Sequence, residues 1–193
     1  MTAYTVPSNG RDVGFLLALF ERPAAQRIYT ESVTQAEHAL QCAALAEAAD
    51  ADDALIAAAL LHDVGHLLTV EETEMATPPG IDRHHEAAGA AYLGHWFDSD
   101  VTRPVALHVA AKRFLCGTDP RYRATLSPAS VHSLELQGGP MSRQQCDAFR
   151  SARGWVSAVE LRRWDDEAKL AGATTPDFDR FRPLLEGLTN RRR

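Results

Sequence analysis

Cysteine is scarce in this 193-residue sequence, and no two cysteines form a closely spaced pair. The three that are present are Cys42, Cys116 and Cys146. An odd number of widely separated cysteines provides neither a disulfide framework nor a Cys-rich zinc motif. Such usage is typical of a reducing compartment, so we expect the protein in the cytoplasm.

Long apolar runs and an excess of positive charge are also missing. No run approaches the roughly 20 apolar residues that a membrane-spanning helix needs, so no membrane association is expected. The N-terminal stretch MTAYTVPSNGRDVG has no charged segment followed by an apolar core, and no secretory signal is expected. The formal net charge of −6 at pH 7 argues against a general nucleic-acid-binding surface.

Alternating strand patterns are almost absent, whereas helical periodicity covers most of the chain. The pattern predicts helices at residues 11–22, 32–49, 52–68, 83–97, 99–115, 128–138, 141–152, 154–171 and 176–189. Residues 75–83 and 171–179 are predicted to be loops because Pro, Gly and Asp punctuate them, and 116–128 to be a longer irregular connection. We therefore expect one all-α domain over residues 1–193, with its core at about 11–185.

The stretch AAALLHDVGHLL, residues 57–68, places His62, Asp63 and His66 in an otherwise apolar helix. Burying such groups without partners costs several kcal/mol each. Hydrogen bonds from neighbouring helices would satisfy them, and so would a metal ion, since neutral imidazole and carboxylate are good ligands. A His-Asp pair followed by a second histidine one turn later favours the metal.

Histidines recur along the chain at intervals of about one helix plus one turn. The gaps between His38, His62, His85 and His108 are 24, 23 and 23 residues. Successive helices can therefore each present one histidine to a shared interior. Asp165, directly after a tryptophan in a late helix, adds another carboxylate.

These side chains form a set of six candidate ligands: His38, His62, Asp63, His85, His108 and Asp165. Six protein ligands are too many for one catalytic metal that must keep open positions. They suit two metals bridged by Asp63, because a carboxylate has two oxygens to share. Imidazole and carboxylate without thiolate favour iron, manganese or a similar metal over a structural zinc site.

The pattern H…HD…H…H…D resembles the HD-domain superfamily, all-α helical bundles that mostly hydrolyse phosphate esters. Six segments resemble one branch more closely: QAEHALQCA, AALLHDVGH, HHEAAGAAYL, HVAAKRFL, LELQGGPM and LRRWDDEAK. This branch is the PhnZ-like family of mixed-valent diiron oxygenases, which cleave the C–P bond of 1-hydroxyalkylphosphonates. The similarity covers roughly residues 11–185 and implies an HD-domain helical bundle with a buried dinuclear metal site.

The resemblance also implies roles for individual residues. It puts one iron on His38, His62 and Asp165 and the other on His85 and His108, with Asp63 bridging the two. The residues that match those around the phosphonate are His66, Lys112, Ser130, Ser133 and Gln137. Because the family's histidine precedes a glutamate, His85 is the expected ligand, and His84 is expected to start the helix or face solvent.

One position departs from the family pattern. The family has a tyrosine three residues before a glutamate, as a lid over the iron and the amine of the substrate. Here Glu31 is in register, but Ile28 occupies the tyrosine position and Tyr29 follows it. Tyr29 and Glu31 are therefore candidates to bind the cationic end of the substrate, with a plain surface loop as the alternative. An aromatic face with a carboxylate would suit a quaternary ammonium group.

The resemblance implies an iron-dependent oxygenase with two iron ions as Fe(II)/Fe(III) and O2 as co-substrate. Its substrate would be 2-amino-1-hydroxyethylphosphonate or the 2-trimethylammonio analogue, giving phosphate and glycine or glycine betaine. It would act after an α-hydroxylating oxygenase in the same pathway. Two alternatives stay open: an HD-type metal-dependent phosphohydrolase acting on a nucleotide or phosphomonoester, and a non-catalytic metal- or ligand-binding bundle.

Overall fold

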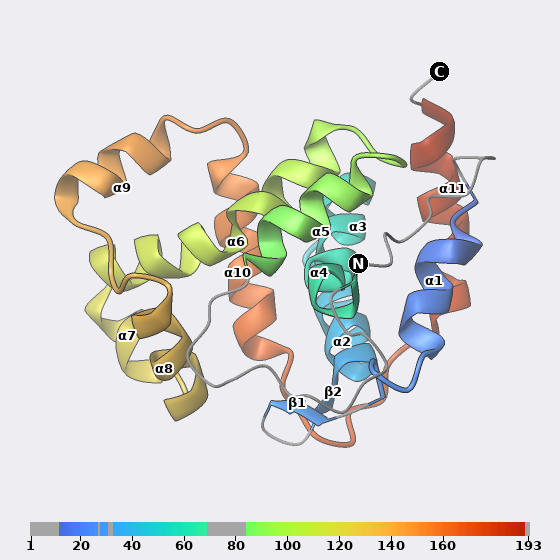
Figure 1. Ribbon diagram of the computed structural model, residues 1–193, viewed down its shortest axis with the longest axis horizontal. Helices are drawn as coiled ribbons and strands as arrows, with labels where there is room; N and C mark the ends of the chain where they lie inside the picture. Colours follow the sequence, from blue (N-terminus) through green and yellow to red (C-terminus); the bar gives the residue numbers. More distant parts are fainter. Residues whose placement is uncertain (1–11, 27, 31–32, 69–83, 192–193) are drawn as a thin grey trace.

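The computed structural model describes residues 12–26, 28–30, 33–68 and 84–191, and most of this part of the chain is helical (Figure 1). The helices are α1 (Gly14–Glu21), α2 (Gln35–Ala48), α3 (Asp53–Leu61), α4 (Val64–Leu68), α5 (His85–Leu93), α6 (Ser99–Thr118), α7 (Pro120–Thr125), α8 (Pro128–Leu136), α9 (Arg143–Arg150), α10 (Trp155–Glu167) and α11 (Arg182–Arg191), with a short 3-10 turn η1 (Phe178–Arg180). The all-α prediction is thereby confirmed.

A small antiparallel ribbon precedes α2, in a region where the sequence pattern predicted no strand. Its strands are β1 (Ile28–Thr30) and β2 (Val33–Thr34), with Ile28 opposite Thr34. Thr34 then caps α2 through a capping box with Glu37. The predicted helix start at residue 32 was therefore too early, because Thr34 ends the ribbon and begins the helix.

The helix predicted over residues 52–68 is divided into α3 and α4. The break falls at His62 and Asp63, where the backbone N–H of His66 donates to the Asp63 carbonyl three residues earlier. Asp52 caps the start of α3 by accepting from the backbone N–H of Leu55. The tighter turn between α3 and α4 lies at the HD motif.

The connection predicted over residues 116–128 is largely helical, so that prediction was wrong. α6 continues to Thr118, and α7 begins at Pro120 because Asp119 caps it by accepting from the backbone N–H of Arg121. The loop predicted at 75–83 lies outside the described residues. The loop predicted at 171–179 is confirmed up to Asp177, where η1 follows.

Two apolar clusters lie side by side along the molecule. The larger joins α1 to α5, the first half of α6, and residues of α10 and α11. The smaller joins the second half of α6 with α7, α8, α9 and the start of α10. Figure 1 shows α7, α8 and α9 at one end, α1 and α11 at the other, and α6 and α10 between them. No described helix is long and apolar enough to cross a membrane.

A close backbone contact fixes how α4 meets α5. A Cβ atom added to Gly65 would lie 2.0 Å from the carbonyl oxygen of His85 and 3.1 Å from the backbone nitrogen of Gly89. Only glycine leaves room for this approach. The glycine of the VGH sequence thus brings the start of α5, with His85, against the HD turn.

Candidate active site

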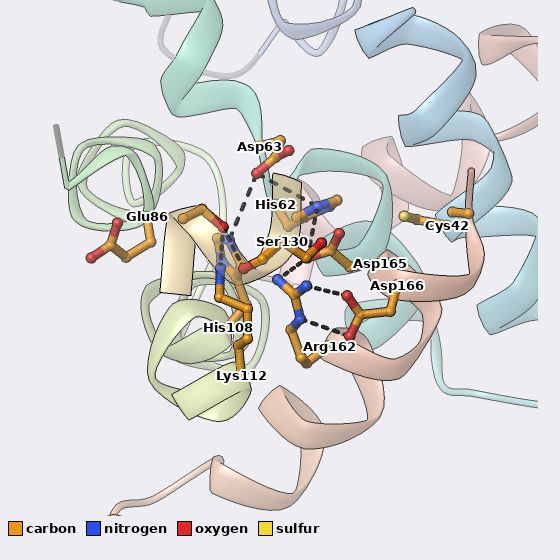
Figure 2. A network of polar contacts seen from close by, with 12 residues as sticks. Cys42, His62, Asp63, Glu86, His108, Lys112, Ser130, Arg162, Asp165 and Asp166 are labelled. Atoms are coloured by element: carbon orange, nitrogen blue, oxygen red, sulfur yellow. Dashed lines mark hydrogen bonds and ion pairs between the residues drawn. The ribbon is translucent and has the colours of Figure 1, made fainter. Parts of the chain in front are cut away.

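The structure brings the six candidate ligands into one buried cluster between α2, the α3–α4 turn, α5, α6 and α10. Their exposed fractions lie between 0% and 8%. Figure 2 shows the His62, Asp63, His108 and Asp165 side chains converging from different helices. They come from these positions: His38 in α2, His62 and Asp63 between α3 and α4, His85 at the start of α5, His108 in α6, and Asp165 in α10.

Asp63 lies at the middle of the cluster. One carboxylate oxygen, Oδ1, is 3.4 Å from His85 Nε2 and 3.7 Å from His108 Nε2. The other, Oδ2, is 3.9 Å from His38 Nε2 and accepts a hydrogen bond of 3.1 Å from the Gln35 amide. Oδ1 also lies 3.6 Å from His62 Nε2, so the carboxylate contacts all four histidines of the set, as a bridging ligand must.

Asp165 belongs to one side of the cluster. Its Oδ1 is 3.4 Å from His38 Nε2, and its Oδ2 is 3.9 Å from His62 Nε2. The Arg162 guanidinium donates to the same Oδ2 at 2.7 Å. One carboxylate of the site is thus held by a charged guanidinium, and the other by a neutral amide.

Backbone carbonyls orient three of the imidazoles. The Nδ1 atoms of His38, His62 and His108 lie 2.8, 2.9 and 2.7 Å from the carbonyl oxygens of Ala168, Ala59 and Val105. Since a carbonyl oxygen only accepts, each Nδ1 carries the hydrogen. In the neutral ring the Nε2 atom then presents its lone pair to the cluster, the arrangement usual for metal-bound histidines.

The inward-facing nitrogens meet in pairs. His38 Nε2 is 3.3 Å from His62 Nε2, and His85 Nε2 is 3.1 Å from His108 Nε2. Two nitrogens at such a distance need either a hydrogen on one of them or a cation beside both. Metal–nitrogen bonds of about 2.0–2.1 Å place neighbouring ligands of one ion about 3 Å apart. The donor set therefore fits two metal positions, one beside each pair.

The charges of the cluster suit metal binding. Burial opposes ionisation of Asp63 and Asp165, but neighbouring histidines and, for Asp165, the Arg162 guanidinium hold both pKa values well below the usual range. Burial and the neighbouring histidines lower the pKa of His108, so its ring is neutral. Burial also opposes a charge on His38, yet the negative groups facing it outweigh burial and raise its pKa. Protons therefore compete with a cation at His38.

A group of hydroxyl and ammonium side chains lies beside the cluster. Lys112, one turn after His108, is 3% exposed and donates to the Ser133 hydroxyl at 2.8 Å. Lys169 donates to the Ser130 hydroxyl at 3.2 Å. Burial and the nearby Arg162 lower the pKa of Lys112 to about 8. Within the described residues no carboxylate lies within ion-pair distance of Lys112, so its positive charge is available to an anion.

Two further expected substrate-binding residues, His66 and Gln137, lie next to His85 and at the end of α8. The His66 ring stacks on His85 with centroids 3.9 Å apart, and its Nε2 is 4.0 Å from Asp63 Oδ1. Burial lowers the pKa of His66 to about 4. Gln137 ends α8, and its buried Oε1 atom has no hydrogen-bond partner among the described residues.

The structure explains why the HVAAKR and QGGPM sequences occur together. Arg113 Nε donates to the Gly139 carbonyl at 2.9 Å, and the Met141 N–H donates to the Arg113 carbonyl at 3.0 Å. Gly138 and Gly139 have φ angles of +94° and +70°, which favour glycine. This clamp fixes the end of α8 to α6, so that Ser133 stays within reach of Lys112.

Sequence reasoning missed part of the site. Arg162, 5% exposed, forms ion pairs with both Asp165 and Asp166, and the Tyr122 hydroxyl donates to Asp166. Lys169 was also missed. The i,i+3 spacing of Arg162 and Asp165 in LRRWDDEAK was a signal for that pair.

Two expectations about the entrance to the site have different outcomes. Tyr29 belongs to β1, but its side chain and all of Glu31 lie outside the described residues. His84 is the N-cap residue of α5, with φ +49° and a side chain 73% exposed. The prediction that His84 starts the helix is confirmed.

The comparisons with known proteins agree with this site. The HD domain model matches residues 36–141, and the chain therefore belongs to the HD-domain family.

Two similar proteins are named as phosphonate dioxygenases. A [1-hydroxy-2-(trimethylamino)ethyl]phosphonate dioxygenase (glycine-betaine-forming) of Leisingera caerulea is 38% identical over 95% of this chain and 93% of its own length. A hydroxymethylphosphonate dioxygenase of Gimesia maris is 44% identical over 88% of this chain and 85% of its own length. An uncharacterized protein of Acanthamoeba polyphaga mimivirus is 32% identical over 91% of this chain and 80% of its own length.

Proposed function

We propose that this chain uses O2 to cleave the C–P bond of a 1-hydroxyalkylphosphonate, releasing inorganic phosphate and a carboxylic acid. The observation that carries the proposal is the buried Lys112 ammonium, which donates to the Ser133 hydroxyl one helical turn from His108. A phosphonate would supply the anion that this ammonium group attracts, and its C1 hydroxyl would lie toward the adjacent metal ligands. The two named relatives are phosphonate dioxygenases, which supports the same chemistry.

The cofactor in this proposal is a pair of iron ions in the mixed-valent Fe(II)/Fe(III) state. His38, His62 and Asp165 would hold one ion, His85 and His108 the other, and Asp63 both. Donors of imidazole and carboxylate type suit iron. When bound, the pair would supply Lewis acidity toward the C1 hydroxyl and a redox-active centre for O2, while the electrons that reduce O2 come from the C–H and C–P bonds of the substrate.

The protein itself would bind and orient the phosphonate group. Lys112 and Lys169 neutralise its charge, and Ser130 and Ser133 offer hydroxyl groups 3.2 and 2.8 Å from these ammonium groups. An anion that displaces these hydrogen bonds gains two charge-assisted ones. Gln137, whose buried amide oxygen has no hydrogen-bond partner in the described part of the chain, lies at the end of α8, the helix that carries both serines.

His66 would meet the substrate as a neutral ring. A pKa of about 4 leaves it uncharged near pH 7. It can therefore donate or accept a hydrogen bond at the phosphonate but adds no charge. Its stacking on His85 would also fix the orientation of that ligand.

The group attached to C1 decides which phosphonate is preferred. The relatives' names include a trimethylamino substrate and hydroxymethylphosphonate, which has no substituent. The nearby carboxylates Asp63, Asp165 and Asp166 are already engaged by histidine, amide or arginine groups. The resemblance to the family assigns a cationic substituent to Tyr29 and Glu31. We propose these two residues as its binding site.

The substrate indicates which reaction must come before this one. A 1-hydroxyalkylphosphonate requires an earlier enzyme that hydroxylates the carbon next to phosphorus, and we propose an α-hydroxylating oxygenase for that step.

All three cysteines are buried and free, which supports a cytoplasmic location.

The test is phosphate release from purified, iron-loaded protein under air and under argon. The substrates are hydroxymethylphosphonate, 2-amino-1-hydroxyethylphosphonate, its trimethylammonio analogue and p-nitrophenyl phosphate. We expect release from at least one phosphonate under air, with one O2 consumed per phosphate and none released under argon. Glu31→Ala should raise the KM of the two cationic substrates and leave that of hydroxymethylphosphonate unchanged.

Two outcomes would contradict the proposal. Release from p-nitrophenyl phosphate under argon, faster than from any phosphonate under air, would favour the phosphohydrolase. Tight binding of iron without turnover of any phosphonate or of p-nitrophenyl phosphate would favour a non-catalytic bundle.

A further inference from the structure

Residues 168–170 follow the end of α10 and run beside α2. The Ala168 carbonyl oxygen lies 2.8 Å from His38 Nδ1. The Leu170 N–H donates to Gln41 Oε1 at 3.0 Å, and Gln41 Nε2 donates to the Leu170 carbonyl at 2.9 Å. The side-chain amide of Gln41 therefore exchanges two hydrogen bonds with the Leu170 backbone, as paired residues of antiparallel strands do.

Alternate residues of this short segment contact different helices. Ala168 and Leu170 both contact α2, through residues that lie three positions apart and so share one face of that helix. Lys169, between them, donates to the Ser130 hydroxyl of α8 at 3.2 Å. One segment thus orients a candidate metal ligand and also presents a cation to the proposed phosphonate site.

Apolar burial does not hold the end of this segment. The Leu170 side chain is 67% exposed, whereas Gln41 is 6% exposed. Among the described residues, Gln41 supplies the hydrogen bonds that join the Leu170 backbone to another helix, while the bond from the Ala173 N–H to the Leu170 carbonyl is local. An apolar side chain in place of Gln41 would leave the Leu170 N–H without that partner. The position of the segment therefore depends on Gln41.

We propose that Gln41 is a positioning residue for both parts of the site. By holding Leu170, it keeps the Ala168 carbonyl on the ring of a metal ligand and the Lys169 ammonium at the phosphonate site. Gln41 itself touches neither the metal nor the substrate. The inference rests on the proposed function for what His38 and Lys169 bind.

The effect on the metal is tested with Gln41→Met, which keeps the length of the side chain and removes both polar atoms. Loss of the outer hydrogen-bond partner of a metal-bound histidine typically lowers metal affinity about 10- to 100-fold. We expect about a tenfold loss at one of the two iron positions, the lower end of that range. The measurement is the iron that the protein retains, without O2, at fixed concentrations of free Fe(II). Gln144→Met, at an exposed position in α9, is the matched control and should retain iron as the wild type does.

The effect on the substrate site is tested with methylphosphonate, whose binding to iron-loaded protein is measured by calorimetry without O2. Lys169→Met should weaken this binding about tenfold, because it removes a charge-assisted hydrogen bond. Gln41→Met should weaken it about threefold or more. Since Gln41 acts on the anion through Lys169, the double variant should bind methylphosphonate no more weakly than Lys169→Met alone.

Thermal unfolding of the metal-free proteins checks that each variant is folded. A role in stability alone would lower the unfolding midpoint of Gln41→Met and leave its iron and methylphosphonate affinities unchanged, and this result would overturn the inference. Losses of methylphosphonate affinity that add up in the double variant would overturn it as well. If Gln41→Met does not fold, Gln41→Glu gives the same measurements with smaller losses, because its carboxylate still accepts from the Leu170 N–H but cannot donate to the carbonyl.

Failure of this inference and failure of the proposed function give different results, because neither binding measurement needs turnover. A wild-type protein that releases no phosphate from any phosphonate refutes the function, and a loss of iron affinity in Gln41→Met still supports the positioning role. A wild type that cleaves a phosphonate, with a Gln41→Met variant that binds iron and methylphosphonate equally well, refutes the inference alone.

Discussion

Arg162→Met tests how far the Asp165 ligand depends on the ion pairs behind it. In the structure the guanidinium donates to Asp165 at 2.7 Å and also pairs with Asp166, to which Tyr122 donates as well. Arg162 is 5% exposed and Asp165 is 7% exposed. Removing the arginine leaves two carboxylates with little solvent and without their principal cation.

The expected loss follows from that burial. Removing one partner of a buried ion pair typically costs about 3–5 kcal/mol. In a chain of this size each kcal/mol shifts the unfolding midpoint by about 2–4 °C, so the midpoint should fall by about 10 °C. The measurement is thermal unfolding of metal-free protein, followed by circular dichroism, so that lost metal does not add to the change.

Metal content separates a positioning role from simple packing. Without Arg162 the Asp165 carboxylate loses the donor that orients it, and iron should fall from two toward one per chain. Arg162→Lys keeps the charge but cannot reach both carboxylates as a planar fork. Its unfolding midpoint and iron content should therefore lie between those of the wild type and those of Arg162→Met. Arg163→Met, the matched exposed control, should change neither quantity. An Arg162→Met protein with the wild-type midpoint and full iron would refute the reasoning.

Three further predictions concern other parts of the site. Asp63→Ala should lower iron well below two per chain and abolish turnover, because no other carboxylate among the described residues faces both histidine pairs. A variant that holds two irons at normal rates would contradict this. For Lys112, the positive charge is present below a pKa of about 8 and lost above it, so kcat/KM for a phosphonate should fall as pH rises through 8. Lys112→Arg should remove this fall of kcat/KM at alkaline pH, because arginine stays charged there. If the fall is unchanged in the variant, another group causes it. Gly65→Ala would place a Cβ atom 2.0 Å from the His85 carbonyl oxygen and should cost on the order of 3 kcal/mol in unfolding free energy, with loss of iron. Gly187→Ala in α11, where a Cβ meets nothing within 4 Å, should be tolerated, and equal effects of the two would refute the packing argument.

Much of the fold was predictable because helices leave a local signal. Apolar side chains repeat with the helical period, and turn residues mark most boundaries. The errors lie where a local contact overrides that period. The tight turn at Asp63 divides one predicted helix in two, and the Asp119 cap begins α7 inside a predicted loop.

The sequence by itself determined the candidate donors, because residue type and helical spacing show which side chains share an interior face. His38, His62, His85 and His108 could be selected in this way, and the structure brings them together. Their orientation could not be read from the sequence. His38 is oriented by the Ala168 carbonyl, 130 positions away along the chain.

Only the tertiary structure decided what surrounds those donors. The contact of Lys169 with Ser130 and the Tyr122–Asp166 pair each join different parts of the chain. Helical periodicity specifies the face on which a residue lies, but not which other helix packs against that face. Packing of α6 against α10 and of α2 against α3 sets those neighbours, because the apolar faces of these helices bury one another.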